Sequence, residues 1–139
     1  MASVLSSVLL AVVVLTGCGG GGSGDRSAGT AELAGTWVLD PAASDSPDFG
    51  MTVTVDATFA GGAVSGTGGC NRYGAAVDAG GDGTLSVGPI RSTKMMCTPE
   101  AAAVEDDYLT RLAAAESFAV GGGRLRIANT AGADLVFRP

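Results

Sequence analysis

The clearest periodicity in the chain is an alternation of apolar and polar residues from Met51 to Phe59. Every second residue of this stretch is apolar, and the residues between them are three threonines and an aspartate. A period of two predicts a half-buried antiparallel strand. Gly61-Gly62 follows directly and predicts a tight turn into a hairpin partner over 63–67.

Further short apolar runs, each bounded by glycine, proline or asparagine, predict the remaining strands. These runs lie at 35–40, which contains Trp37, and at 75–79, 84–87, 117–120, 124–127 and 134–137. Seven or eight short strands at this spacing predict an α+β fold, mainly an antiparallel sheet or partial barrel.

One segment, about 98–115, has a helical period. Thr98 is the expected N-cap. Pro99 suits the first helical position, because a main-chain N–H at that position has no acceptor within the helix and its absence in proline costs no hydrogen bond. The stripe expected to pack on the sheet is Ala101, Val104, Tyr108, Leu112 and Ala115, with Leu109 beside it. The residues expected to face water are Glu105, Asp106, Thr110 and Arg111, and Asp107 and Arg111 form a supporting pair.

The start of the chain predicts export. Residues 4–15 are a run of 12 that is apolar except for two serines. Such a run is too short to span a bilayer of about 30 Å as a helix, and it fits the apolar region of a signal peptide. Leu15-Thr16-Gly17-Cys18 resembles the lipobox of bacterial lipoproteins, so 1–17 are expected to be removed and Cys18 to carry diacylglycerol and palmitate. Met1-Ala2-Ser3 holds no Lys or Arg, so either the true start lies upstream or the signal is weak. An ordinary secretory signal with an incidental cysteine is the alternative.

Residues 18–32 are expected to form a lipidated tether. The stretch 19–29 is rich in glycine and serine and has almost nothing to bury. About twelve residues of this kind reach roughly 20 Å by random-coil scaling, and two or more acyl chains anchor stably. We therefore expect a domain at the cell membrane, facing the extracytoplasmic side.

The cysteines and the charges limit the kinds of bond, site and partner that are expected. With Cys18 assigned to lipid, Cys70 and Cys97 are left as a disulfide pair in an oxidising compartment. The chain has no histidine and no C-x-x-C, so neither a zinc site nor another cofactor is expected. The net charge is −6, from 14 acidic and 8 basic residues, and no basic run is present. Nucleic acid is therefore not expected as a partner.

Four motifs in order point to a family. They are Gly35-Thr36-Trp37, then the G-x-x-G-C-N-x-Y segment 66–73, then Val87-Gly88-Pro89-Ile90, and finally the T-x-M-x-C segment 93–97. In this order they resemble the META domain, the module of the heat-shock protein HslJ and of many small bacterial lipoproteins. The resemblance covers 33–139 and both domain cysteines. The resemblance implies an association with stress tolerance, and it implies no enzymatic reaction.

Asn71, Arg72, Tyr73 and Lys94 are the candidate contact residues for a partner, because the neighbouring glycines let a partner approach the backbone. A structural role is the alternative, in which Asn71 caps a turn, Arg72 is solvated and Tyr73 packs on the sheet. Met95 and Met96 are expected to fill the core.

The function expected from these features is that of a non-catalytic envelope lipoprotein, a monomer that binds an envelope protein or component. Without histidine there is no Ser–His or Cys–His pair for nucleophilic catalysis. One alternative is a carrier that holds a small molecule or lipid inside the partial barrel. Another is an inhibitor of a secreted enzyme.

Overall fold

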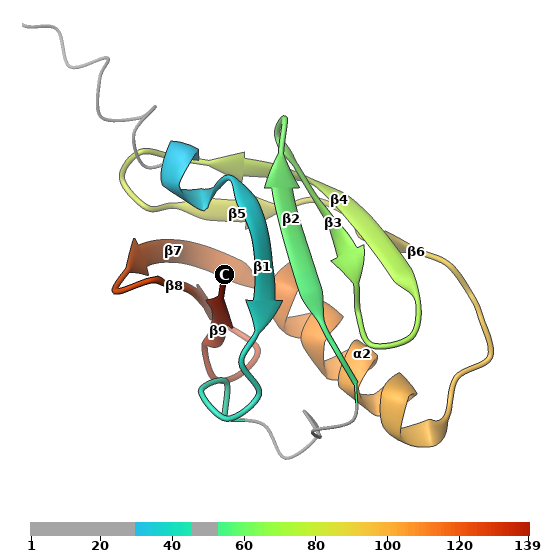
Figure 1. The fold of residues 1–139 in the computed structure, drawn as a ribbon. Helices are drawn as coiled ribbons and strands as arrows, with labels where there is room; N and C mark the ends of the chain where they lie inside the picture. The colour runs from blue at the N-terminus through green and yellow to red at the C-terminus, as the bar shows by residue number, and fades with distance from the viewer. Residues whose placement is uncertain (1–29, 46–52) are drawn as a thin grey trace, which may run out of the picture.

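The computed structural model describes residues 30–45 and 53–139. In this part of the chain, nine antiparallel strands form one sheet in the order β5-β4-β3-β2-β1-β9-β8-β7, and β6 pairs with β4 (Figure 1). The strands are β1 (Gly35–Leu39), β2 (Asp56–Ala60), β3 (Ala63–Thr67), β4 (Arg72–Ala79), β5 (Leu85–Val87), β6 (Arg91–Ser92), β7 (Ala115–Gly121), β8 (Arg124–Asn129) and β9 (Leu135–Arg138). The helix α2 spans Pro99–Ala113, and residues 30–33 are also helical.

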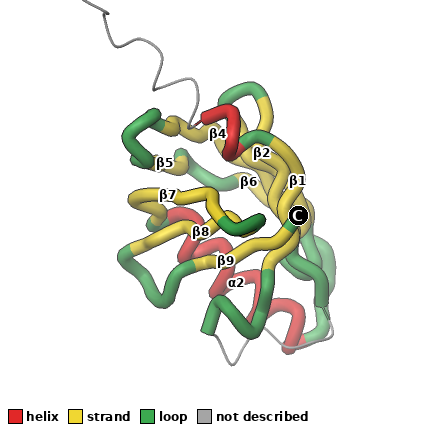
Figure 2. Tube along the Cα trace, turned by 60° about the vertical axis from the view of Figure 1, so that its left-hand side comes forward, coloured by secondary structure: helices red, strands yellow, loops and turns green. Residues whose placement is uncertain are grey.

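The sheet curls until its two end strands meet, which gives a nearly closed barrel (Figure 2). β5 and β7 are joined at an isolated bridge between Thr84 and Ser117. Beside this bridge the Phe118 N–H donates to the Gly83 carbonyl at 2.8 Å. The predicted partial barrel with one packed helix is thus confirmed, and the two-residue β6 is an additional strand.

The core lies between the inner face of the sheet and α2, which packs against β5, β8 and β9. The strand residues that alternate inward are fully or almost fully buried, among them Ala57, Phe59, Val64, Leu125, Ile127, Leu135 and Phe137. The helix contributes Tyr108 and Leu112, both with no exposed surface. The Trp37 indole N–H donates to the Leu33 carbonyl at 2.9 Å, so the indole closes the end of the core next to residues 30–33.

The strand periodicity is confirmed, with two shifts in the boundaries. Val55, Ala57 and Phe59 are buried as expected, but β2 begins only at Asp56, and 51–52 lie outside the described residues. The strand predicted over 75–79 begins earlier, because Arg72 and Tyr73 already belong to β4 and pair with Thr67 and Gly66. The glycines before them therefore form a short turn between two ordered strands.

The helix begins as predicted. Thr98 is the N-cap, and its Oγ1 accepts the Ala101 N–H at 3.3 Å. Ala101, Val104, Tyr108 and Leu112 form the buried stripe. The helix ends at Ala113, two residues earlier than predicted, and Ala115 starts β7.

Two side chains of α2 that were expected to face water are buried, so that part of the prediction is wrong for Glu105 and Arg111. The Arg111 guanidinium donates from Nη1 to the Ser44 carbonyl at 3.0 Å and to the Ala133 carbonyl at 3.4 Å. Its Nε donates to Asp107 at 3.2 Å, as the i,i+4 spacing predicts. Arg111 is covered because loops from distant parts of the sequence pack over it, which helical periodicity alone does not reveal.

The predicted signal peptide, Cys18 and the tether through residue 29 lie outside the described residues. In the described part of the chain, α2 and the short turn at 30–33 are both too short or too polar to cross a membrane.

Candidate functional site

Asn71 and Glu105 form the centre of a buried polar cluster that ties the turn before β4 to the middle of α2. The two residues are 6% and 9% exposed. One carboxylate oxygen of Glu105 accepts the Asn71 main-chain N–H at 2.6 Å and the Cys70 N–H at 3.2 Å. The other accepts the Asn71 side-chain amide at 2.8 Å. Burying the carboxylate is tolerated because three N–H groups replace the water that it loses.

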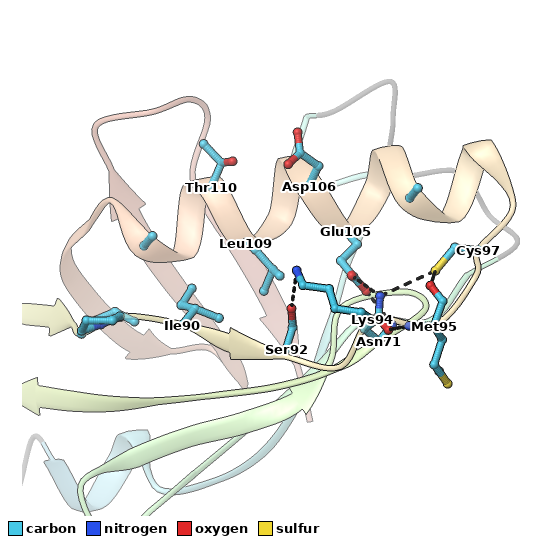
Figure 3. Close-up of a pocket in the computed structure, with 15 residues that line it drawn as sticks. Asn71, Ile90, Ser92, Lys94, Met95, Cys97, Glu105, Asp106, Leu109 and Thr110 are labelled. Atoms are coloured by element: carbon cyan, nitrogen blue, oxygen red, sulfur yellow. Dashed lines mark hydrogen bonds between the residues drawn. The ribbon is translucent and has the colours of Figure 1, made fainter.

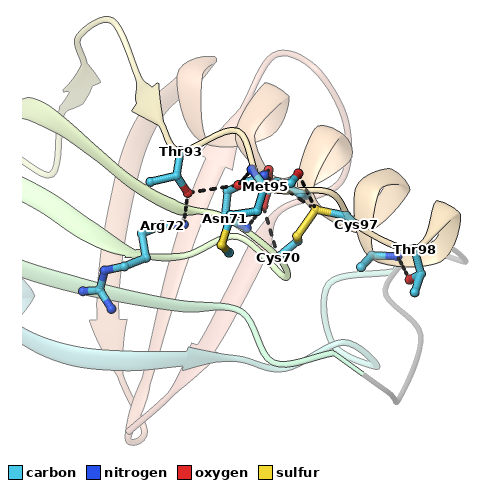
Figure 4. Close-up of a disulfide and its surroundings, with 9 residues drawn as sticks. Cys70, Asn71, Arg72, Thr93, Met95, Cys97 and Thr98 are labelled. Atoms are coloured by element: carbon cyan, nitrogen blue, oxygen red, sulfur yellow. Dashed lines mark hydrogen bonds between the residues drawn. A yellow bond between two sulfur atoms is a disulfide. The ribbon is translucent and has the colours of Figure 1, made fainter.

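The side-chain oxygen of Asn71 accepts hydrogen bonds from the segment that leads into the helix. Its Oδ1 accepts the Met95 N–H at 2.7 Å and the Thr93 hydroxyl at 2.9 Å (Figure 4). The Thr93 hydroxyl oxygen also accepts the Arg72 N–H at 3.2 Å. One asparagine thus connects the turn, the segment 93–95 and α2.

A disulfide between Cys70 and Cys97 lies beside this cluster, with the two Cα atoms 6.0 Å apart. It connects the residue before Asn71 to the residue before the helix N-cap. The sequence predicts this pairing, and in the structure it reinforces the connection that Asn71 makes through hydrogen bonds.

The glycines of the turn allow the Glu105 side chain to come close to the main chain of the turn. A Cβ on Gly68 would lie 2.9 Å from the Glu105 Cγ, closer than such atoms pack. Gly69 has a φ of 120°, a conformation that side chains disfavour. The glycine run is therefore needed for an intramolecular contact.

Tyr73 and Tyr108 form a second buried polar contact, with their hydroxyl oxygens 2.6 Å apart. The Tyr73 hydroxyl donates to the Asp56 carbonyl at 2.9 Å, so Tyr108 donates to Tyr73. Burial raises the pKa of both phenols above the ordinary 10.0, and the negative charge of Asp56 raises them further. For Tyr73, the Tyr108 hydroxyl lowers the pKa by a smaller amount than burial raises it.

The four candidate contact residues have different surroundings. Asn71 and Tyr73 are buried in the contacts above, whereas Arg72 and Lys94 are exposed. That these residues contact a partner stays a prediction, and the side chains of Arg72 and Lys94 are those that a partner can reach without a change in the fold.

Met95 and Met96 are not core residues, so that expectation is wrong. They are 58% and 101% exposed. Asn71 and the disulfide hold the backbone on both sides of the pair, and this keeps the segment at the surface.

A groove of about 770 Å³ runs between α2 and the segment 87–97 (Figure 3). The buried residues Asn71 and Glu105 are among those that line it. Its walls combine apolar residues such as Ile90 and Leu109 with the polar residues Ser92, Lys94, Asp106 and Thr110. The Lys94 ammonium group donates to the Ser92 hydroxyl at 3.5 Å and reaches into the groove. A groove of this size with a few polar groups suits a peptide segment or a small molecule.

Of the residues that line this groove, sequence reasoning identified Asn71 and Lys94 as candidate contact residues but not Glu105. A glutamate on a helix is normally solvated, and nothing in the local sequence marks this one as the partner of Asn71. In residues 30–45 and 53–139, no group of three His, Cys, Asp or Glu side chains is placed to hold a metal ion.

Comparisons with known proteins place the chain in a family. The family model described as META domain matches residues 31–139, two residues before the predicted boundary. No curated protein sequence matches the chain significantly. An NMR structure of a protein from Burkholderia xenovorans is similar at 24% identity and a TM-score of 0.58, covering 99% of this chain and 97% of the other. A crystal structure of a DUF4847 family protein from Bacteroides vulgatus has 15% identity and a TM-score of 0.54, covering 76% and 92%. At these identities the likeness shows the fold.

Proposed function

Because the chain belongs to the META domain family, we propose that this protein is a non-catalytic lipoprotein of the bacterial envelope whose domain binds an envelope protein or component in the groove beside α2. The observation that carries the proposal is the groove of about 770 Å³ itself, open to solvent and lined by both apolar and polar side chains. A role in stress tolerance is part of this proposal.

The rigidity of one groove wall supports binding. The segment 93–97 is held by the Asn71 side chain and by the Cys70–Cys97 disulfide. A wall that is ordered before binding reduces the entropy lost when a partner docks, so more of the contact energy appears as affinity.

The residues in and around the groove favour binding over catalysis. The chain has no histidine, and both domain cysteines are in the disulfide. Glu105 already accepts three hydrogen bonds, so its carboxylate is occupied as a structural acceptor. Asp106 and Lys94 are exposed groups that can recognise a partner by charge.

Anchoring is proposed from the N-terminal sequence. Cleavage before Cys18 would leave a glycine-rich segment that connects a lipidated cysteine to the domain. This arrangement would keep the groove close to the membrane, where envelope components are concentrated.

A carrier function would use the same groove and not the barrel interior. The interior is filled by side chains with no exposed surface, including Tyr108, Leu125 and Phe137. Inhibition of a secreted enzyme is a special case of binding in which the captured partner is an enzyme.

Affinity capture from envelope extracts tests the proposal. Thr110→Trp fills the groove, whereas Ala103→Trp adds the same side chain to an exposed position of α2 outside the groove. We expect the wild type and Ala103→Trp to capture the same component and Thr110→Trp to lose it. Equal capture by all three proteins, with equal melting temperatures, would show that the groove is not the binding site.

A further inference from the structure

Two arginines that are 19 positions apart in sequence are neighbours on the outer face of the barrel. In the β4–β6 register Arg91 lies opposite Gly74, and Arg72 lies two residues before Gly74 on the same face. The pairing continues past β6, since the Thr93 N–H donates to the Arg72 carbonyl at 3.0 Å. Diagonal neighbours in such a ladder lie roughly 7–8 Å apart, within reach of long side chains.

These two arginines have no acidic partner among the described residues. The salt bridges there are those of Arg111 with Asp107, Arg124 with Asp40 and Arg126 with Asp134. Two aspartates share the outer face of β2–β4. The Asp56 carboxylate accepts the Thr67 N–H at 3.1 Å and forms no salt bridge with either arginine, and Asp78 lies at the far end of β4. In a chain of net charge −6, Arg72 and Arg91 are thus two neighbouring positive charges without a salt bridge in the part of the chain that the structure describes.

The same edge of the molecule carries the two exposed large hydrophobic residues of the described part, Met95 and Met96. In Figure 3 the Met95 side chain points away from α2, and in Figure 4 that of Arg72 also extends away from the helix. The strand register and these views place Arg72, Arg91 and Met95 on one exposed surface, and Met96 is the fully exposed residue next to Met95; these four residues are here called the docking face.

A shallow depression of about 410 Å³ adjoins the docking face. It is floored by small residues of β3 and β4, including Ser65, Gly74 and Ala76, and is bordered by Pro89 and Arg91. A ligand group can approach the sheet closely here, next to a guanidinium.

We propose that the docking face rests on the surface of a bilayer that contains anionic phospholipids. The two arginines would contact lipid phosphates, and the two methionines would enter the boundary between headgroups and acyl chains. Against these two arginines stand 14 acidic and six other basic residues, since the chain has eight basic residues in all, and the exposed Arg124 and Arg126 of β8 are already paired with aspartates. The charge distribution therefore favours this face. The proposal takes its cellular setting from the proposed lipid anchor but does not depend on the groove.

The position where the chain enters the domain is compatible with this orientation. Thr30 lies beside the β2–β3 turn and the end of β4, at the opposite end of the sheet from Arg72. β4 has eight residues and so spans roughly 26 Å at about 3.3 Å per residue. The tether expected from the sequence, with a random-coil reach of roughly 20 Å, would let the domain lie along the membrane with this face down.

Vesicle sedimentation tests the proposal with residues 18–139 carrying Cys18→Ser, the proposed mature chain without its lipid. One set of vesicles is phosphatidylcholine alone, and the other contains about one third phosphatidylglycerol. We expect binding to the anionic vesicles that weakens with added salt, and little binding to the neutral ones. The variant Arg72→Ala/Arg91→Ala should bind the anionic vesicles at least tenfold more weakly, at about fivefold per arginine.

Arg124→Ala/Arg126→Ala is the matched control, since it removes the same charge from exposed positions on β8. It should bind almost as well as the unchanged chain, and Met95→Ser/Met96→Ser should bind several-fold more weakly. Equal binding to both kinds of vesicle, or an equal loss in the control, would overturn the proposal. Unchanged binding by the methionine variant would overturn the part assigned to the methionines.

The test also separates this proposal from the proposed function. If the chain ignores vesicles and the Arg72→Ala/Arg91→Ala variant instead loses an envelope protein in the capture experiment, the docking face binds an acidic protein and not lipid. Loss of capture by Thr110→Trp with normal vesicle binding would concern the groove alone.

Discussion

The carboxylate of Glu105 accepts hydrogen bonds from both the main-chain N–H and the side-chain amide of Asn71, at 2.6 and 2.8 Å. The two residues are 34 positions apart, one in the turn before β4 and the other in the middle of α2. This contact fixes how the helix sits on the sheet, and with it the width of the groove.

Glu105→Ala should destabilise the domain strongly. It leaves the N–H groups of Cys70 and Asn71 and the Asn71 amide buried without their acceptor, and each lost charge-assisted bond costs about 1.5–3 kcal/mol. We expect a loss of at least about 3 kcal/mol, which lowers the melting temperature on the order of 10 °C or more. Thermal unfolding followed by circular dichroism measures it.

Asp106→Ala is the control for this prediction, because Asp106 is the exposed neighbour of Glu105 on the same helix. Its melting temperature should stay within about 2 °C of the wild type, as for most surface substitutions. Similar melting of both variants would mean that the Glu105–Asn71 contact contributes little to stability.

The Cys70–Cys97 disulfide should contribute about 3 to 4 kcal/mol, since it closes a loop with a sequence separation of 27. Reduction, or Cys70→Ser/Cys97→Ser, should therefore lower the melting temperature by on the order of 10 °C or more. Peptide mapping under non-reducing conditions should find the two cysteines linked in exported protein. Free alkylatable thiols in folded material would contradict the prediction.

The tyrosine pair should make stability fall at alkaline pH. Burial raises the pKa of Tyr73 and Tyr108, so the native protein keeps both protons where the unfolded chain begins to lose them, at about pH 10. The unfolded state then binds fewer protons, and the free energy of unfolding decreases as pH rises above that value. Below it, this contribution is fully present.

Phenolate absorbance provides the measurement, because these are the chain's two tyrosines. Little phenolate should form above pH 10 until the circular dichroism signal is also lost. Titration of either tyrosine near pH 10 in folded protein would show that the pair is accessible to solvent.

Lipidation of Cys18 is the fourth prediction. The intact mass of the native protein should equal residues 18–139 plus acyl chains. Cys18→Ser should remove the acyl mass and release the chain from membranes after a high-salt wash, which screens contacts of the docking face. A wild-type protein recovered in the medium without lipid would contradict the prediction.

The sequence predicts most of the fold because each strand carries its own local signal. Alternation marks β2, glycine turns separate the hairpins, and Thr98-Pro99 marks the start of α2. These signals depend only on residues that are neighbours along the chain, so they can be recognised without knowledge of the tertiary structure.

The site is less predictable because its main contacts join distant segments. The helical periodicity of apolar residues predicts that Glu105 and Arg111 face solvent, yet both are buried because a turn or a loop packs over them. Met95 and Met96 show the opposite error, since apolar character alone does not place a residue in the core. The proximity of Arg72 and Arg91 follows only from the β4–β6 register, so no basic patch is visible in the sequence.

The barrel closes at Thr84 and Ser117 through much weaker strand pairing than elsewhere in the sheet. Most neighbouring strands are joined by a continuous ladder of hydrogen bonds, whereas β5 and β7 share an isolated bridge and the hydrogen bond from the Phe118 N–H to the Gly83 carbonyl. The barrel can therefore open between β5 and β7 with the fewest broken hydrogen bonds. Amide hydrogens near 83–85 and 117–118 should thus exchange with solvent sooner than those between β1 and β2, and Leu85 and Phe118 are the first core side chains that such an opening would wet.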